Sequence, residues 1–160
     1  MLTRASLVYP IPPAPRTAVL LAGFRSKGSV RVFPDGWTEE AARFAPQSLA
    51  GRRDQIEALK GIAQPTHALI VIRREWETGL SAQDRDCLWR AFRIPLFEQI
   101  INQEGVVLAA ECEAHNGLHI ESQWLAVGDH EIDRSLCGCG KASPRLIERE
   151  VLHKVAAGGK

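Results

Sequence analysis

The uninterrupted apolar run at residues 68–72, Ala-Leu-Ile-Val-Ile, constrains the fold more than any other segment of the chain. A run of this length without polar alternation is typical of a strand that is buried on both faces of a sheet. The pattern Ser81-Ala82-Gln83-Asp84 follows and predicts a helix N-terminus, because the serine and aspartate side chains can each accept a hydrogen bond from a backbone amide. A buried strand followed by a helix favours the α/β fold class.

Other apolar segments extend this pattern on both sides. In chain order, the expected elements are strands at 18–24 and 29–33, a helix from Thr38 to Phe44, a helix at 49–59, the strand at 68–72, the helix from Ser81, and strands at 105–111, 118–122 and 124–127. Past Pro144 the chain is interpreted as a polar helix or tail. The order β-β-α-α-β-α-β-β-β predicts an α/β fold with a small mixed sheet and flanking helices.

Length and composition bound the domain organisation. The 160 residues correspond to about one ordinary domain, and 45% apolar with 24% charged residues is a globular composition. Pro10, Pro12, Pro13 and Pro15 predict an extended N-terminal arm at residues 1–16. We therefore expect one α/β domain at 17–147 and a polar tail at 148–160.

Charge and hydropathy disfavour two classes of partner. Twenty Lys and Arg against nineteen Asp and Glu leave a net charge of +1, whereas proteins that bind nucleic acid through phosphates usually carry a basic surplus. No apolar run approaches the ~20 residues of a membrane helix, and residues 1–4 lack the apolar core of a signal peptide. We expect a cytoplasmic protein that binds neither nucleic acid nor membranes.

Three of the four cysteines cluster with a histidine toward the C-terminus. Cys112 and His119 are followed by the tight pair Cys137 and Cys139, and a Cys₃His set satisfies tetrahedral zinc. Four protein ligands leave no open coordination position, so the expected zinc is structural and binds the C-terminal β segment. His115 also has ligand-like spacing from Cys112, but His119 is favoured because it lies in an expected strand. The alternative is three buried thiols and one hydrogen-bonded histidine.

The same segment carries a family resemblance. The residues Cys112-Glu113-Ala114-His115-Asn116-Gly117-Leu118-His119-Ile120, then Cys137-Gly138-Cys139-Gly140 and Pro144-Arg145-Leu146, resemble the phenylacetate-CoA ligase family of adenylate-forming enzymes. The likeness extends, more weakly, over residues 45–147. It implies an α/β adenylation fold and a structural zinc held by Cys112, His119, Cys137 and Cys139.

The chain departs from that family at its nucleotide-binding positions. Residues 23–28 poorly match the phosphate loop, and the adenine-binding segment corresponds to residues 100–104, where only the acid, Glu104, is retained. Gly128 and Asp129 correspond to a ribose-binding pair. We expect no room in this chain for the family's C-terminal domain, which carries the catalytic lysine. Glu104, Gly128 and Asp129 are thus either remnants of a cofactor site or ordinary turn residues. ATP and CoA are doubtful cofactors.

Two functions follow from these departures. The first is a zinc-stabilised, non-catalytic binding or accessory protein that resembles a fragment of an adenylation domain. The alternative is a subunit of a split or oligomeric acyl-CoA ligase whose ATP loop and lid come from another chain. A truncated sheet exposes the unpaired backbone groups of an edge strand or an apolar face, which another chain can cover. We therefore expect a homodimer or a partner protein.

The remaining cysteine and two pairs of arginines are interpreted without a functional role. Cys87 lies in the helical pattern that follows Ser81 and is expected to be a buried, inert thiol. The basic pairs Arg52-Arg53 and Arg73-Arg74 are expected to be solvated.

Overall fold

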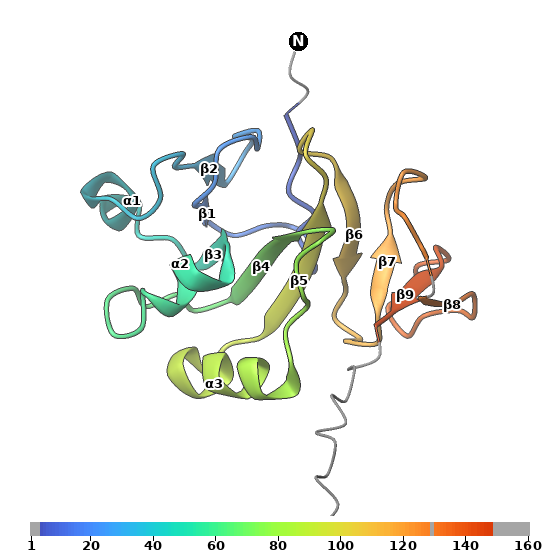
Figure 1. Ribbon diagram of the computed structural model, residues 1–160. Helices are drawn as coiled ribbons and strands as arrows, with labels where there is room; N and C mark the ends of the chain where they lie inside the picture. Colours follow the sequence, from blue (N-terminus) through green and yellow to red (C-terminus); the bar gives the residue numbers. More distant parts are fainter. Residues whose placement is uncertain (1–3, 129, 149–160) are drawn as a thin grey trace, which may run out of the picture.

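A computed structural model of the protein describes residues 4–128 and 130–148, and its centre is a nine-stranded mixed sheet (Figure 1). The strand order is β2-β1-β3-β4-β5-β6-β7-β9-β8. The strands are β1 (Thr17–Val19), β2 (Val30–Val32), β3 (Ser48–Gly51), β4 (Ala68–Arg74), β5 (Leu96–Ile101), β6 (Val107–Glu111), β7 (Leu118–Ile120), β8 (Glu131–Asp133) and β9 (Arg145–Ile147). The helices are α1 (Glu39–Phe44), α2 (Arg53–Glu57) and α3 (Ala82–Phe92). The α/β class and the mixed sheet are therefore confirmed.

The sheet has a parallel half and an antiparallel half that meet between β5 and β6. Strands β2, β1, β3, β4 and β5 pair in parallel, whereas β5–β6, β6–β7, β7–β9 and β9–β8 pair antiparallel. The direction changes because the chain reverses in a tight turn after β5, where the Gly105 N–H donates to the Asn102 carbonyl oxygen at 3.1 Å. Parallel neighbours instead need a crossover connection, which the three helices supply in the first half.

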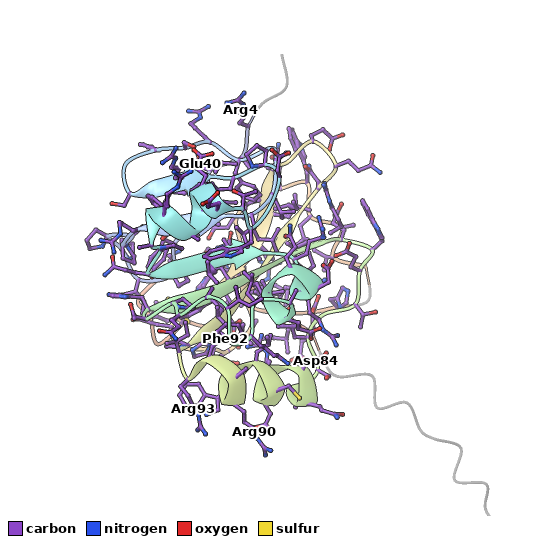
Figure 2. The ribbon with its side chains drawn as sticks, turned by 90° about the vertical axis from the view of Figure 1, so that its left-hand side faces the viewer. Arg4, Glu40, Asp84, Arg90, Phe92 and Arg93 are labelled. Carbon is purple, nitrogen blue, oxygen red and sulfur yellow. The ribbon has the colours of Figure 1, made fainter. Side chains whose placement is uncertain are left out.

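All three helices pack on one face of the sheet. Ala41 of α1, Ile56 of α2 and Leu88 of α3 belong to one buried cluster with Leu49 and Leu69 of the sheet. Crossovers between parallel strands are right-handed, so connections that advance along the sheet in one direction all lie on one face. The β1–β2 connection runs in the opposite direction and lies on the other face, where Phe24 joins a second buried cluster. Figure 2 shows Arg90 and Arg93 projecting from α3 away from the sheet.

The second face of the sheet is covered by extended chain from the N-terminus. Ala5 pairs with Phe24 in a parallel bridge, and Leu7 and Val8 pack against the second cluster. The Tyr9 hydroxyl lies 2.9 Å from the Ser48 Oγ, and the buried Gln99 amide donates to the Val8 carbonyl oxygen. This part of the proline-rich segment therefore packs against the buried strands.

The structure corrects the expected secondary structure in both halves of the sheet. Residues 48–51 form strand β3, and the helix predicted at 49–59 is limited to α2. The β3 segment is fully buried between β1 and β4, and pairing on both sides outweighs the helical spacing of its apolar residues. No strand forms at 124–127, and β8 arises where no strand was predicted. The polar helix or tail expected past Pro144 is wrong at residues 145–147, which form β9 by pairing with β7 and β8. None of the described helices has the length and apolar character of a membrane span.

Helix α3 begins at the predicted residue, but the side chains that it buries differ from those expected. The Ser81 Oγ accepts from the Asp84 N–H, and the Asp84 carboxylate accepts from the Ser81 N–H, both at 3.0 Å. The buried residue of this helix is Leu88, whereas Cys87 is exposed, so the expectation of a buried Cys87 thiol is wrong. Adjacent helix positions differ by about 100°, which separates the two environments.

A buried ionic cluster joins α3 to the centre of the sheet. Arg85 Nη2 donates to Glu98 Oε1 at 2.8 Å and to Glu111 Oε1 at 2.9 Å, linking α3 to β5 and β6. Arg73, at the end of β4, donates to Glu98 Oε2 at 3.0 Å and to Glu148 at 2.5 Å. Arg73 is 6% exposed, so the expectation that it is solvated is wrong. Burial is tolerated here because each charge has opposite charges as hydrogen-bond partners.

The adjacent residues Leu88 and Cys87 test the packing of α3. We expect Leu88→Ala to lower the free energy of unfolding by about 2–5 kcal/mol, because it leaves a cavity in the helix-covered core. Cys87→Ala should change it by less than about 0.5 kcal/mol, because an exposed position loses little packing. Urea unfolding followed by circular dichroism measures both, and equal losses would contradict the helix orientation.

Candidate metal centre

Four side chains from the antiparallel half converge on one point. Cys112 directly follows β6, His119 is the central residue of β7, and Cys137 and Cys139 lie in the loop between β8 and β9. One ligand atom from each lies within 4.8 Å of every other. Cys112, Cys137 and His119 are buried and Cys139 is half-buried. The structure thus brings together the four residues that the sequence singles out as a metal set.

The distances between donors suit a tetrahedral metal ion. The Sγ atoms of Cys112 and Cys137 are 3.6 Å apart, and the Cys139 Sγ is 3.3 Å from His119 Nε2. Zinc with Zn–S bonds of about 2.3 Å and Zn–N bonds of about 2.0 Å places such pairs about 3.8 and about 3.5 Å apart at tetrahedral angles. Three thiols and one imidazole are donors that zinc prefers, so the residues present fit this metal.

The histidine ring is oriented for metal binding by a residue of the β8–β9 loop. His119 Nδ1 lies 2.8 Å from the Ser143 Oγ and 3.1 Å from the Ser143 carbonyl oxygen. Because a carbonyl oxygen accepts only, Nδ1 carries the proton and Nε2 keeps its lone pair toward the cysteines. A metal-ligating histidine commonly has its second nitrogen held in this way. Ser143 is not identifiable from the sequence, because a serine close before β9 carries no spacing signal.

Backbone amides stabilise the sulfur atoms. The Lys141 N–H donates to the Cys139 Sγ at 3.5 Å. The N–H of Cys139 donates to Cys137 and lowers the pKa of that thiol to about 6. Burial raises the pKa of the Cys112 thiol to about 11. Since thiolates are the metal ligands, Cys137 is prepared to bind a cation at neutral pH, whereas Cys112 releases its proton when a metal binds.

Two glycines allow the chain to converge on the site. At Gly117 the backbone has φ +86°, and a Cβ there would lie 2.6 Å from the Ile147 side chain and 2.8 Å from the Leu146 carbonyl oxygen. Only glycine therefore lets the turn before β7 approach β9 this closely. Gly140 has φ +88° and closes the turn after the two cysteines, where its N–H donates to the Cys137 carbonyl oxygen at 2.9 Å.

His115 lies outside the cluster. Its Nδ1 is 3.0 Å from Glu111 Oε2, and its ring stacks on Phe97 with the centroids 4.9 Å apart. The histidine in the strand, His119, is thus the one that faces the three cysteines.

The residues proposed for nucleotide binding are not gathered with the Cys/His cluster. Glu104 is exposed in the turn between β5 and β6, and Gly128 is exposed in the segment between β7 and β8. Asp129 lies outside the described residues.

Comparison with known proteins finds a similar fold among solved structures, but no matching family model or curated sequence. No protein-family model and no curated protein sequence matches the chain. Among solved structures, the chain is similar to an open conformation of 2-hydroxyisobutyryl-CoA ligase in complex with 2-HIB-AMP and CoA, with a TM-score of 0.55 and 14% identity. The match covers 83% of this chain and 44% of the ligase chain. The fold thus resembles part of an acyl-CoA ligase, without singling out the phenylacetate-CoA ligases.

Zinc content tests the ligand set directly. We expect about one zinc per chain after dialysis, because four protein donors hold the ion tightly. Cys139→Ser should lose this zinc, whereas Cys87→Ser and His115→Gln should retain it. Elemental analysis of the four proteins measures the content. Zinc retained in Cys139→Ser, or lost in His115→Gln, would contradict the assignment.

The hydrogen bond from His119 to Ser143 gives a second test. We expect Ser143→Ala to weaken zinc affinity by about tenfold, since residues that orient a ligating histidine contribute about 10–100-fold and the carbonyl oxygen stays in place. Competition with a chromogenic chelator measures the affinity, and Ser135→Ala provides a serine control in the same β8–β9 loop. Equal affinities for Ser143→Ala and the parent protein would show that the hydroxyl does not orient the ring.

Proposed function

We propose that the chain is a zinc-stabilised, non-catalytic binding or accessory protein built on part of an adenylate-forming fold. The observation that carries this proposal is the Cys/His cluster, because its four donors all come from the protein. A metal with four protein ligands has no open position for substrate or water. Its contribution is then to hold Cys112, His119, Cys137 and Cys139 together.

The residues around the expected nucleotide positions favour a role without catalysis. The resemblance maps the aromatic and the small adenine-binding positions onto Ile100 and Ile101, both of which are buried in β5. Glu104 and Gly128 are exposed in two separate loops. Acyl-adenylation depends on groups pre-arranged around developing charge, and this arrangement offers few of them.

A split or oligomeric acyl-CoA ligase is the second candidate. The chain spans 44% of the length of the ligase that it resembles, and that ligase binds an acyl adenylate and CoA. Trp76, Trp124 and Leu136 are 63%, 64% and 74% exposed, which suits contact with another protein chain. A homodimer would use the same apolar side chains or the sheet edges at β2 and β8. None of the four cysteines, all of which the structure describes, forms a disulfide bond, as is usual for proteins in the reducing cytoplasm.

ATP–pyrophosphate exchange separates the two candidates. With 2-hydroxyisobutyrate or phenylacetate as acid, we expect no exchange by the purified chain, while a complete acyl-CoA ligase serves as positive control. Exchange by the chain alone that Glu104→Gln abolishes would contradict a non-catalytic role. Exchange that appears only in a complex isolated with a second protein would establish the split ligase. Light scattering after size exclusion gives the mass of the species assayed.

A further inference from the structure

A small cavity lies where the parallel strands end. Its volume is about 40 Å³, and its walls come from Leu21 after β1, Arg52 after β3, Ile72 and Arg74 of β4, and Ile101 of β5. All of these residues lie at or beyond the carboxyl ends of their strands. The cavity therefore draws on four parallel strands and on none of the Cys/His ligands.

The topology of the sheet makes this edge a place for a ligand. The chain leaves β1 toward the face that holds Phe24, and it leaves β3 toward the opposite face, which carries α2. Adjacent strands whose connections diverge in this way open a crevice at their carboxyl ends, where open α/β sheets bind their ligands. Leu21 and Arg52 follow these two strands and line the cavity.

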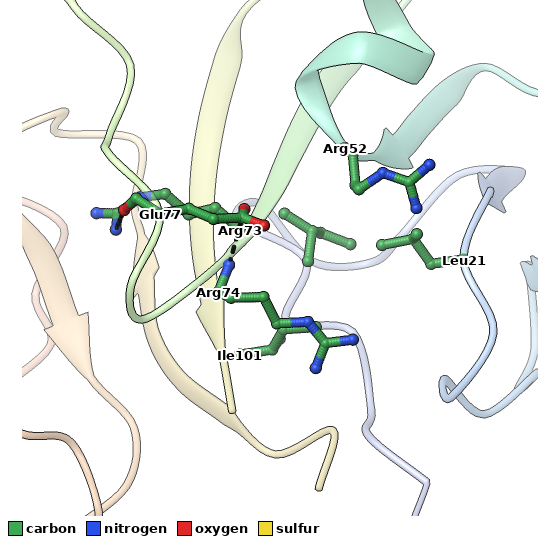
Figure 3. A pocket seen from close by; sticks show the side chains of 7 residues that line it. Leu21, Arg52, Arg73, Arg74, Glu77 and Ile101 are labelled. Carbon is green, nitrogen blue, oxygen red and sulfur yellow. Dashed lines mark hydrogen bonds between the residues drawn. The ribbon is translucent and has the colours of Figure 1, made fainter. Parts of the chain in front are cut away.

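Two guanidinium groups are available to a ligand in this cavity. Figure 3 shows the side chains of Arg52 and Arg74 extending to the same side, with Leu21 and Ile101 beside them. Arg74 forms no ion pair among the described residues, and its Nη1 donates to the Asn102 carbonyl oxygen at 2.8 Å. Arg52 pairs with Asp54 at 3.2 Å, but both side chains are about half exposed or more, so this pair is weak.

The remaining charged groups at the cavity are already occupied. The Arg73 guanidinium contacts Glu98 and Glu148, so Arg73 is neutralised within the ionic cluster. The Glu77 carboxylate accepts from the Arg74 backbone N–H at 3.1 Å, which orients the end of β4. Among the residues that line the cavity, Arg52 and Arg74 against Glu77 leave one positive charge in excess, and Asp54, which lies outside the lining, offsets it only through its weak, exposed pair with Arg52.

We propose that this cavity binds the oxyanion group of a small organic acid through Arg52 and Arg74. Guanidinium groups suit carboxylate and phosphate oxygens, because they donate several charge-assisted hydrogen bonds in one plane. A volume of about 40 Å³ holds about three water molecules, which is close to the size of one such group. Leu21, Ile72 and Ile101 form an apolar wall beside it. The ligand class is therefore a carboxylate or phosphate joined to a compact apolar body.

The test is anion binding to the full chain, measured by nuclear magnetic resonance with inorganic phosphate and with butyrate as separate probes. We expect one or both to shift the backbone amides of Leu21, Arg52 and Ile101 in a saturable way. Binding of butyrate alone assigns a carboxylate ligand, and binding of phosphate alone assigns a phosphate. Arg74→Gln should weaken the affinity at least about tenfold, in keeping with the loss of a charge-assisted hydrogen bond.

Two further variants provide a second change at the cavity and a control away from it. Arg52→Gln changes an exposed side chain, so it should fold normally and also weaken binding severalfold. Arg90→Gln removes an exposed charge that projects from α3 away from the sheet (Figure 2), and it should bind as the parent does. The proposal is overturned if neither probe shifts these amides at 20 mM, or if Arg90→Gln weakens binding as much as Arg52→Gln.

Discussion

The central interaction of the antiparallel half of the sheet is the convergence of Cys112, His119, Cys137 and Cys139 from three separate segments. Strands β7, β8 and β9 have three residues each, and no described helix packs on them. Five buried residues form their core cluster, two of which belong to β6 and one to β5. So little buried apolar surface stabilises a small unit only marginally, and a structural metal is a common remedy. The proposed zinc would connect the end of β6, the middle of β7 and the β8–β9 loop.

The parallel half is stabilised by other means. Apart from the edge strand β2, its strands are largely buried, by the three helices on one side and by residues 5–9 with Phe24 on the other. The cluster of Arg85, Glu98 and Glu111 joins α3 to β5 and β6, where the two halves meet. Each half thus has its own source of stability. The arginine-lined cavity belongs to the parallel half, and the Cys/His cluster belongs to the antiparallel half, so the two sites can be altered separately.

The sequence predicted those features that depend on local chemistry. The strand at 68–72, the capping box at Ser81 and the grouping of the four metal-type ligands are all found in the structure. Residues 49–51, expected at the start of a helix, belong instead to β3, because their strand character comes from pairing with neighbours distant in sequence. Two of the three residues of β8 and one of the three of β9 are charged, so neither strand shows as an apolar run, and both form through pairing of β9 with β7 and β8. Ser143 and the pairing of Arg73 with Glu98 likewise depend on tertiary contacts that spacing does not encode.

We propose that the Cys/His cluster is a closed tetrahedral zinc site. X-ray absorption at the zinc edge on the purified protein measures the ligand shell itself. We expect about three sulfur neighbours at about 2.3 Å and one imidazole nitrogen at about 2.0–2.1 Å, with no bound water. A first shell dominated by oxygen or nitrogen, or a folded protein that binds no zinc, would contradict it.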